Sequence, residues 1–277
     1  DMDSIKIYVA AHKPTIKYGD KHFRLIHVGA ALHPNVEISG AVKDNSSTDN
    51  ISAKNGIYCE LTALYYMWKS VHDVANIGLC HYRRYFVTKS KLTKHPEKII
   101  VPAKKLAEDL TQCDIILGKP GRKGGPTNGF FTNPLDVPEF CVYRNILPSL
   151  NTLYPEYVDT YYQEFFQPTM SYCNMMVCSK TLFDEYCEFL FSVIFDAERR
   201  WKESGIGVAP REMGYISEYL LNTWVRYHHL KTKYYPIGLF EDTTRIGFKV
   251  HYALQSIGLN SILGPLADKF YRGFLKK

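Results

Sequence analysis

Short apolar runs alternate with longer amphipathic segments along this chain, and this alternation limits the folds that it can adopt. The strand-length runs are 5–11, 77–82, 114–118 and 172–178, with a late edge strand expected at 234–237. The helical patterns cover 53–71, 136–166 in pieces, 181–200 and 210–227. Strands that alternate with helices predict an α/β fold, in which helices flank a sheet. No internal repeat or Pro- or Ser-rich linker divides the chain, so we expect one domain with a C-terminal extension.

The clearest helix is predicted at 53–71. Its apolar residues recur at helical spacing from Ile57 to Trp68 and form one stripe. Ser52 precedes the stripe and is the expected N-cap.

Composition excludes several classes of protein. With 45% hydrophobic and 22% charged residues among 277, the chain is not disordered, and no apolar stretch approaches the ~18 residues of a membrane span. The seven cysteines form no C-x-x-C pair, which indicates a reducing compartment and buried thiols. The net charge of +6 comes from scattered lysines and arginines, so it argues against nucleic acid and suits phosphate-bearing molecules or an anionic membrane.

The densest polar group stands at the carboxyl end of the run 77–82, where His81, Tyr82, Arg83 and Arg84 follow one another. Open α/β sheets bind their ligands at this edge. Two guanidiniums there offer forked donors to a diphosphate, and His81 could exchange a hydrogen bond or hold a metal. The alternative is a solvated arginine pair beside a packed histidine and tyrosine, but the clustering favours a functional site.

Two further segments are candidates for binding a nucleotide. Small residues end the run 5–11 and let a flat base or ribose approach the backbone, and a lysine that could neutralise phosphate follows. The polar segment 44–55 offers carboxylates and amides to a base or ribose, although a solvated loop with a helix cap explains it as well. The candidate donor-binding residues here are Ala10, Ala11, His12, Lys13, Asp44, Asn50 and Asn55.

Glu218 is the candidate general base. In a helix over 210–227 it shares a face with Arg211 and Gly214, and apolar surroundings would raise the pKa of its carboxyl group. The structural alternative is an ion pair with Arg211 or Arg226.

Other residues complete the expected site. Asp136 and Glu139 are reserve candidates for the base, and Asn174 and Arg211 are candidates for binding the acceptor. The Gly-rich loop 119–126 is the best lid candidate. No dinucleotide-binding or P-loop glycine motif is present, so those nucleotide folds are not expected.

Several motifs together resemble a known family. These are Lys54-Asn55-x-x-Tyr58-Cys59-Glu60, His81-Tyr82-Arg83-Arg84-Tyr85, Phe183-Asp184-x-Tyr186-Cys187-Glu188 and Gly214-Tyr215-Ile216-Ser217-Glu218. They resemble bacterial capsular and exopolysaccharide biosynthesis proteins that are built on a glycosyltransferase-A-like domain. The resemblance spans about residues 5 to 240.

The resemblance implies a GT-A-like mixed sheet over 1–240 and a helical extension over 241–277. It implies transfer of a sugar, galactofuranose in some members, from a UDP-linked donor to a lipid-linked saccharide, with inversion. Related transferases end the equivalent strand in Asp-x-Asp, which clamps a divalent metal against the diphosphate. Here His81-Tyr82-Arg83 takes that place, so we expect arginines to replace the metal, with Mn²⁺ or Mg²⁺ as the alternative.

The tail after residue 265 alternates aromatic and basic residues, as peripheral membrane segments do. With no secretory signal evident, we expect a cytoplasmic enzyme at the inner face of the membrane. The alternatives are a non-catalytic carbohydrate- or nucleotide-binding scaffold of a polysaccharide assembly complex and a hydrolase of nucleotide sugars. The sequence does not indicate the oligomeric state.

Overall fold

A mixed sheet forms the centre of the protein, as the sequence predicts. The computed structural model describes residues 4–89, 96–122 and 146–240. The strands of the sheet are β1 (Ile5–Ala11), β2 (Phe23–His27), β3 (Val42–Lys43), β4 (Asn76–His81), β5 (Arg84–Phe86), β6 (Ile115–Gly118), β9 (Met176–Ser179), β10 (Thr232–Tyr235) and β11 (Ile237–Leu239). The main path runs β10-β6-β9-β4-β1-β2-β3, and β5 joins β4 to β11. A separate small sheet pairs β7 (Gly121–Arg122) with β8 (Thr169–Met170).

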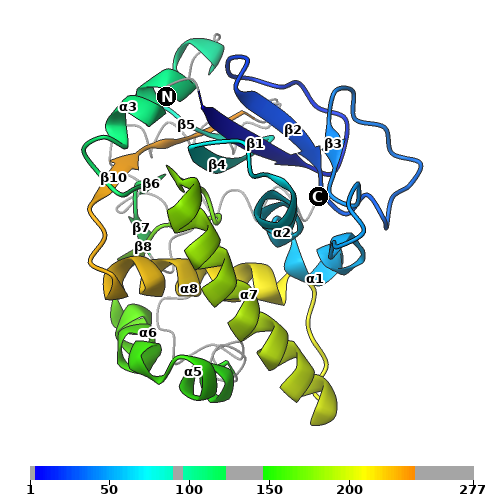
Figure 1. Cartoon of the computed structure of the whole chain (residues 1–277), viewed down its shortest axis with the longest axis vertical. Coiled ribbons are helices and arrows are strands. Elements are labelled where there is room, and N and C mark those ends of the chain that lie inside the picture. Colours follow the sequence, from blue (N-terminus) through cyan, green and yellow to red (C-terminus); the bar gives the residue numbers. More distant parts are fainter. Residues whose placement is uncertain (1–3, 90–95, 123–145, 241–277) are drawn as a thin grey trace, which may run out of the picture.

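Helices lie on both sides of this sheet (Figure 1). They are α1 (Asn55–Tyr58), α2 (Leu61–Ser70), α3 (Ala103–Asp109), α5 (Leu147–Leu153), α6 (Val158–Phe166), α7 (Lys180–Glu203) and α8 (Glu212–Tyr227). Three short 3-10 turns cover Ser52–Lys54, Pro96–Lys98 and Pro155–Tyr157. This arrangement confirms the predicted α/β class, and β10 at the end of the sheet confirms the predicted edge strand. No helix in the described ranges is long and apolar enough to cross a membrane.

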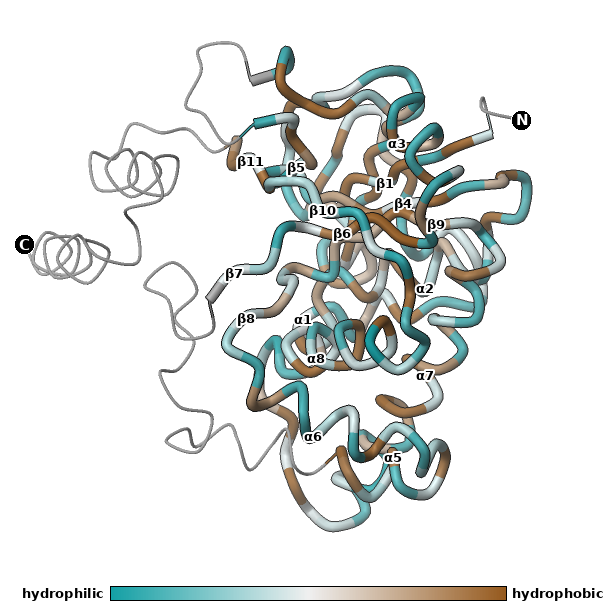
Figure 2. Tube along the Cα trace, turned by 90° about the vertical axis from the view of Figure 1, so that its left-hand side faces the viewer, coloured by the Kyte–Doolittle hydropathy of each residue, from teal (hydrophilic) through white to brown (hydrophobic). Residues whose placement is uncertain are grey.

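Alternating side chains of β1 supply both layers of the core. Tyr8 and Ala10 pack in the cluster beneath α2, α7 and α8, whereas Ile7 and Val9 pack in the cluster that includes α3. This follows from the two-residue period of a strand. In Figure 2 the apolar colour accordingly concentrates along the central strands.

The helix predicted at 53–71 is broken at Cys59. This residue has φ 50° and ψ −129°, and it separates α1 from α2. The apolar stripe is present, since Leu61 and Leu64 are fully buried. The spacing of apolar residues, however, gives no sign of a positive φ at a residue other than glycine. The prediction for Ser52 was also wrong, because its hydroxyl donates a hydrogen bond to Asp44 and does not cap the helix.

The run 172–178 is a strand only from Met176 onward. β9 lies antiparallel to both of its neighbours, β4 and β6, so its first residue stands beside the last residues of β4. Just before it, Cys173 and Asn174 have φ of 72° and 50°, which ends the extended conformation predicted there. A left-handed turn is thus placed at the carboxyl edge of the sheet, next to His81.

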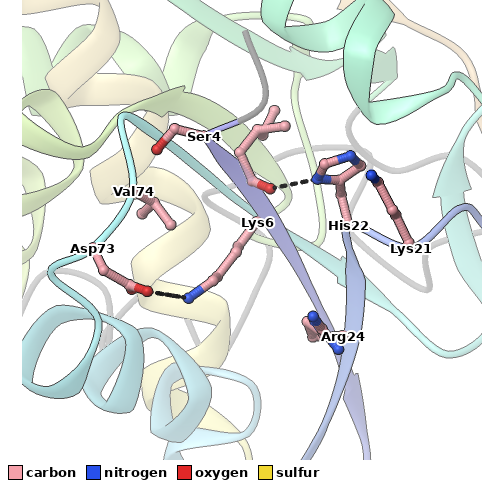
Figure 3. A pocket seen from close by; sticks show the side chains of 8 residues that line it. Ser4, Lys6, Lys21, His22, Arg24, Asp73 and Val74 are labelled. Atoms are coloured by element: carbon pink, nitrogen blue, oxygen red, sulfur yellow. Dashed lines mark hydrogen bonds and ion pairs between the residues drawn. The ribbon is translucent and has the colours of Figure 1, made fainter. Parts of the chain in front are cut away.

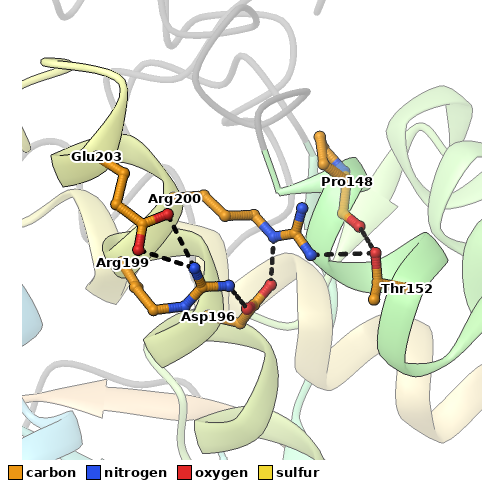
Figure 4. A network of polar contacts seen from close by, with 6 residues as sticks. All are labelled: Pro148, Thr152, Asp196, Arg199, Arg200 and Glu203. Atoms are coloured by element: carbon orange, nitrogen blue, oxygen red, sulfur yellow. Dashed lines mark hydrogen bonds and ion pairs between the residues drawn. The ribbon is translucent and has the colours of Figure 1, made fainter.

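A polar network joins α7 to α5 (Figure 4). The Arg200 guanidinium donates to Asp196 Oδ2 at 2.6 Å and to Thr152 Oγ1 at 3.1 Å. Burial opposes ionisation of Asp196, but hydrogen bonds from Arg200 and Arg199 outweigh it and lower the Asp196 pKa to about 2. The network therefore attaches α5 to α7, the long helix that packs on the sheet.

A substitution at Gly78, in the middle of β4, tests how tightly the sheet is packed. A Cβ at this position would lie 2.8 Å from Val177 Cγ2, 2.9 Å from Ile7 Cδ1 and 2.9 Å from the Met176 carbonyl oxygen. We expect Gly78→Ala to lower the free energy of unfolding in urea by about 1–3 kcal/mol, because the strand neighbours must move apart. Gly56→Ala is the control, since nothing lies within 4 Å of its added Cβ. Equal stability of the two variants would contradict this packing.

Candidate active site

The ends of β1 and β4 bring two of the predicted groups together. Ala10 lies opposite His81 in the parallel pairing of these strands, and the Tyr82 N–H donates to the Ala10 carbonyl at 3.0 Å. Parallel strands end at the same edge of a sheet, so the segments 10–13 and 81–84 form one surface. This juxtaposition was not visible in either segment alone.

The Tyr82 ring is the centre of this surface. His12 meets it edge-on with ring centroids 5.3 Å apart. Lys13 Nζ and Arg83 Cζ lie 5.5 Å and 5.2 Å from its centroid. Such contacts between cations and a ring hold the cationic groups close together.

The positive charges on this surface repel one another. Burial lowers the pKa of His12, and the charges of Lys13 and Arg83 lower it further. An anion bound here would offset that repulsion. We therefore define Lys13, Tyr82 and Arg83 as the cationic edge of the site.

His81 links the cationic edge to the interior. Its Nε2 donates a hydrogen bond to the Cys173 carbonyl at 2.7 Å. Burial lowers the His81 pKa, and the charge of Arg84 adds to this effect. The imidazole is therefore held neutral, with Nε2 engaged as a donor.

Two carboxylates meet at the left-handed turn before β9. Glu218 Oε1, from α8, accepts the Cys173 N–H at 2.8 Å. Glu60 Oε1, from the turn before α2, accepts the Asn174 side-chain amide at 2.7 Å, and the same amide donates to the Gly214 carbonyl at 3.0 Å. Consecutive residues of one turn thus hold both acidic side chains.

Glu218 is the most strongly perturbed acid of this group. Burial raises its pKa, the negative charge of Glu60 raises it further, and the result is about 8. The Cys173 N–H and the charges of Arg84 and Arg211 oppose the shift. Glu218 is only 9% exposed, so desolvation is the dominant cause. The expectation of a raised pKa is confirmed in direction.

Arg211 lies immediately before α8, with a left-handed backbone at φ 66°. Its guanidinium stands 5.3 Å from the Tyr215 ring centroid. Three residues further on, Gly214 faces Cys59, since a Cβ at Gly214 would lie 3.3 Å from both the Cβ and the Sγ of Cys59. The break at Cys59 therefore brings α1 close to the start of α8.

Two thiols adjoin the carboxylates. Burial raises the pKa of Cys59 and of Cys173 to about 12 each, and the charge of Glu60 contributes to both shifts. Both thiols are therefore protonated at neutral pH and do not act as nucleophiles there.

Asp44 supports a loop within the protein. Its carboxylate is 1% exposed and accepts the N–H groups of Gly29 at 2.7 Å and Ala30 at 3.1 Å, as well as the Ser52 hydroxyl. These bonds fix the turn that follows β2. The structure therefore places Asp44 beneath the edge of the sheet and not on its surface.

Asn50 and Asn55 also bond within the chain. The Asn50 amide donates to the Ser47 carbonyl at 2.7 Å, and the Asn55 amide donates to the Cys59 carbonyl at 2.7 Å. Asn55 thereby supports the break between α1 and α2. Asn174 is 0% exposed, so its amide acts on Glu60 from inside the protein.

Other predicted features lie outside the described residues. These are the reserve bases Asp136 and Glu139, residues 123–126 of the loop 119–126, and the extension 241–277 with its basic tail.

The donor groups at the end of β4 do not fit a divalent cation. They are the imidazole of His81, the phenol of Tyr82 and the guanidinium of Arg83, where a metal clamp would need carboxylates. Among the residues that the structure describes, no group of three His, Cys, Asp or Glu side chains could hold a metal ion. Arg83 bears a fixed positive charge at this strand end, and its replacement of a metal stays an expectation.

Comparison with known proteins assigns the chain to a family. Residues 6–229 match the family model described as Domain of unknown function (DUF4422). The chain belongs to this family. A search of curated proteins finds no match.

A solved structure is similar to this DUF4422 chain. It is the apo form of the WbbM bifunctional glycosyltransferase, with a TM-score of 0.73 and 28% sequence identity over 87% of this chain and 46% of that one. This likeness confirms the resemblance to a glycosyltransferase family that the motifs indicated. The DUF4422 chain spans less than half the length of that protein.

A hollow of about 270 Å³ lies elsewhere on the DUF4422 domain, at the amino ends of β1 and β2 (Figure 3). Lys6 Nζ binds Asp73 there at 2.8 Å, and His22 Nδ1 lies 3.2 Å from the Ile5 carbonyl. None of the predicted site residues line this hollow.

Sequence reasoning missed Glu60 as a site residue. A signal was present, because Glu60 is the sole charged residue of the run 57–64 and lies three residues after Ile57 and four before Leu64. An acid on the apolar stripe of a predicted helix needs a partner inside the protein. The partner, Asn174, lies 114 residues away, which sequence alone does not indicate.

The raised pKa of Glu218 predicts a pH-dependent stability. Its folded-state pKa of about 8 exceeds the ordinary 4.5, so the folded protein retains a proton that the unfolded chain loses. The resulting stabilisation is complete below about pH 4.5 and is lost as the pH rises through about 8. Urea unfolding should show wild type losing about 1–4 kcal/mol relative to Glu218→Gln between about pH 5 and pH 9. Parallel curves for the two proteins would contradict the shift.

Proposed function

We propose that this chain is a glycosyltransferase that moves a sugar from a UDP-linked donor to a lipid-linked saccharide. The observation that carries the proposal is the buried Glu218 carboxyl group, which has a raised pKa and feels the charge of Arg84. Arg84 is the residue that follows Arg83 of the cationic edge. The likeness to a bifunctional glycosyltransferase supports the same reaction class.

The cationic edge is the proposed site of the donor diphosphate. Arg83 and Lys13 both lie against the Tyr82 ring, and Arg84 is the next residue along the chain. Charge-assisted hydrogen bonds from guanidinium groups are strong and suit phosphate oxygens. Ala10 and Ala11 end β1 beside this edge, and we propose that the nucleoside lies against the backbone there.

Glu218 is the proposed base of an inverting displacement. Its ionised carboxylate takes the proton of the acceptor hydroxyl, and the hydroxyl oxygen forms a bond to the anomeric carbon of the sugar. The bond between that carbon and the diphosphate oxygen breaks, and its electron pair stays on the leaving UDP. Arg83 and Arg84 stabilise the charge that develops on this group. No step requires a metal ion.

The remaining assignments follow from this placement. Arg211, which is exposed and lies beside Tyr215, is the proposed contact to the acceptor. Residues 1–240 form the proposed catalytic domain, and the basic tail of 241–277 is proposed to hold the enzyme at an anionic inner membrane surface, where lipid-linked acceptors lie.

Glu218→Gln tests the proposed chemistry. The amide keeps the shape of the side chain and cannot accept the proton, so we expect turnover to fall by about 10²–10⁴-fold while the dissociation constant for the UDP-sugar changes little. The measurements are UDP release with a saccharide acceptor and calorimetric titration of the donor that raises the melting temperature most.

Two outcomes would contradict the proposal. Full pathway activity of Glu218→Gln would indicate a non-catalytic scaffold. Equal UDP release by wild type with and without the acceptor would indicate a nucleotide-sugar hydrolase.

Arg83→Gln tests the cationic edge. We expect UDP to bind about ten- to hundredfold more weakly to this variant, because a hydrogen bond between two charged groups is lost. The salt dependence of UDP binding should also decrease. Lys104→Gln on the exposed surface of α3 is the control for removing one positive charge. Loss of affinity in both variants to the same extent would show that only net charge matters.

A further inference from the structure

The two carboxylates of the site are held as a unit. Glu218 Oε1 accepts the backbone N–H of Cys173 at 2.8 Å, and Glu60 Oε1 accepts the side-chain amide of the next residue, Asn174, at 2.7 Å. The Cys173 carbonyl accepts from His81 at 2.7 Å. One two-residue turn therefore fixes the proposed base, a second acid and the histidine at the end of β4.

The turn adopts an unfavourable backbone to do this. Cys173 and Asn174 both have positive φ, at 72° and 50°, a conformation that non-glycine residues adopt only occasionally. Asn174 is fully buried and its amide orientation is fixed by two acceptors, Glu60 and the Gly214 carbonyl. The surrounding contacts thus hold Glu60 in place through a strained segment.

Three segments packed around Glu218 each carry a charged group that changes the pKa of its carboxyl group. The turn before α2 presents Glu60, β5 presents Arg84 and the residue before α8 presents Arg211. The titratable groups nearby are Cys59, His81, Cys173, Tyr215 and Tyr219. Of all these groups, only Glu60 is a further carboxylate.

We propose that Glu60 is a positioning residue that makes the ionised Glu218 a stronger base towards the proton of the acceptor hydroxyl. Glu60 is fixed by Asn174 and acts on Glu218 through its negative charge. This inference rests on the proposed function for its role in turnover, whereas the electrostatic coupling of Glu60 to Glu218 exists with or without a substrate.

The coupling has a chemical use. A carboxylate close to another negative charge is a stronger base, because protonation relieves the repulsion between the two groups. When Glu218 takes the proton, the pair goes from two negative charges to one. The Glu218 proton later leaves to solvent, which restores the starting state.

Glu60→Gln is the test, because its amide oxygen still accepts from Asn174 while the charge is gone. We expect the apparent pKa of Glu218 to fall by about half a unit or more, as measured by ¹³C NMR of carboxyl-labelled glutamate in the ligand-free protein. The Glu218 signal is identified by its loss in Glu218→Gln. The acid limb of the kcat/KM profile should move down in pH by the same amount, and kcat at high pH should decrease.

Two controls separate charge from structure. Glu60→Asp keeps the charge and should retain a Glu218 pKa closer to wild type than Glu60→Gln does. Glu188→Gln removes an exposed charge from α7 and should leave the Glu218 pKa unchanged. A thermal melt of each variant confirms folding.

The outcomes distinguish this inference from the proposed function. An unchanged Glu218 pKa in Glu60→Gln overturns the inference whatever the activity. A shifted pKa in a protein that transfers no sugar from any UDP donor leaves the coupling intact and overturns the proposed function. A shifted pKa with an unshifted kcat/KM profile also overturns the role in turnover.

Discussion

The antiparallel placement of β9 between β4 and β6 is the constraint on which the site depends. With β9 reversed, its beginning meets the end of β4, and residues 92 positions apart come within hydrogen-bond distance. A parallel strand in this position would bring its last residues to that edge and leave the turn at Cys173 on the opposite side of the sheet. The direction of β9 therefore determines which residues meet at this edge, and the individual side chains then determine its chemistry.

The same strand arrangement places positive and negative side chains in two separate groups. Positive groups gather where β1 and β4 end, around Tyr82. The carboxylates of Glu218 and Glu60 gather at the turn before β9, which α8 and the start of α2 reach. Arg84 acts on this second group, since its charge opposes the shift at Glu218. A leaving group and a base need opposite electrostatic surroundings, and the proposed reaction would use the two groups of charges in these two roles.

The sequence predicted the strands and helices of the fold better than it predicted the turns and breaks between them. The runs 5–11 and 77–82 and the helix over 210–227 were identified, because burial imposes a period that sequence displays. The break at Cys59 and the turn at Cys173 were not, since neither residue type favours a left-handed backbone and tertiary contacts impose it. Glu218 was identified from its apolar neighbours, whereas Glu60 required the distant Asn174 to be placed beside it.

The two thiols next to the carboxylates have a consequence for the chemical durability of the site. Cys59 and Cys173 are both partly accessible, yet their high pKa values leave almost no thiolate for reaction with alkylating agents or peroxide. A cysteine can therefore form a strained turn beside the proposed base without making this part of the protein sensitive to oxidation.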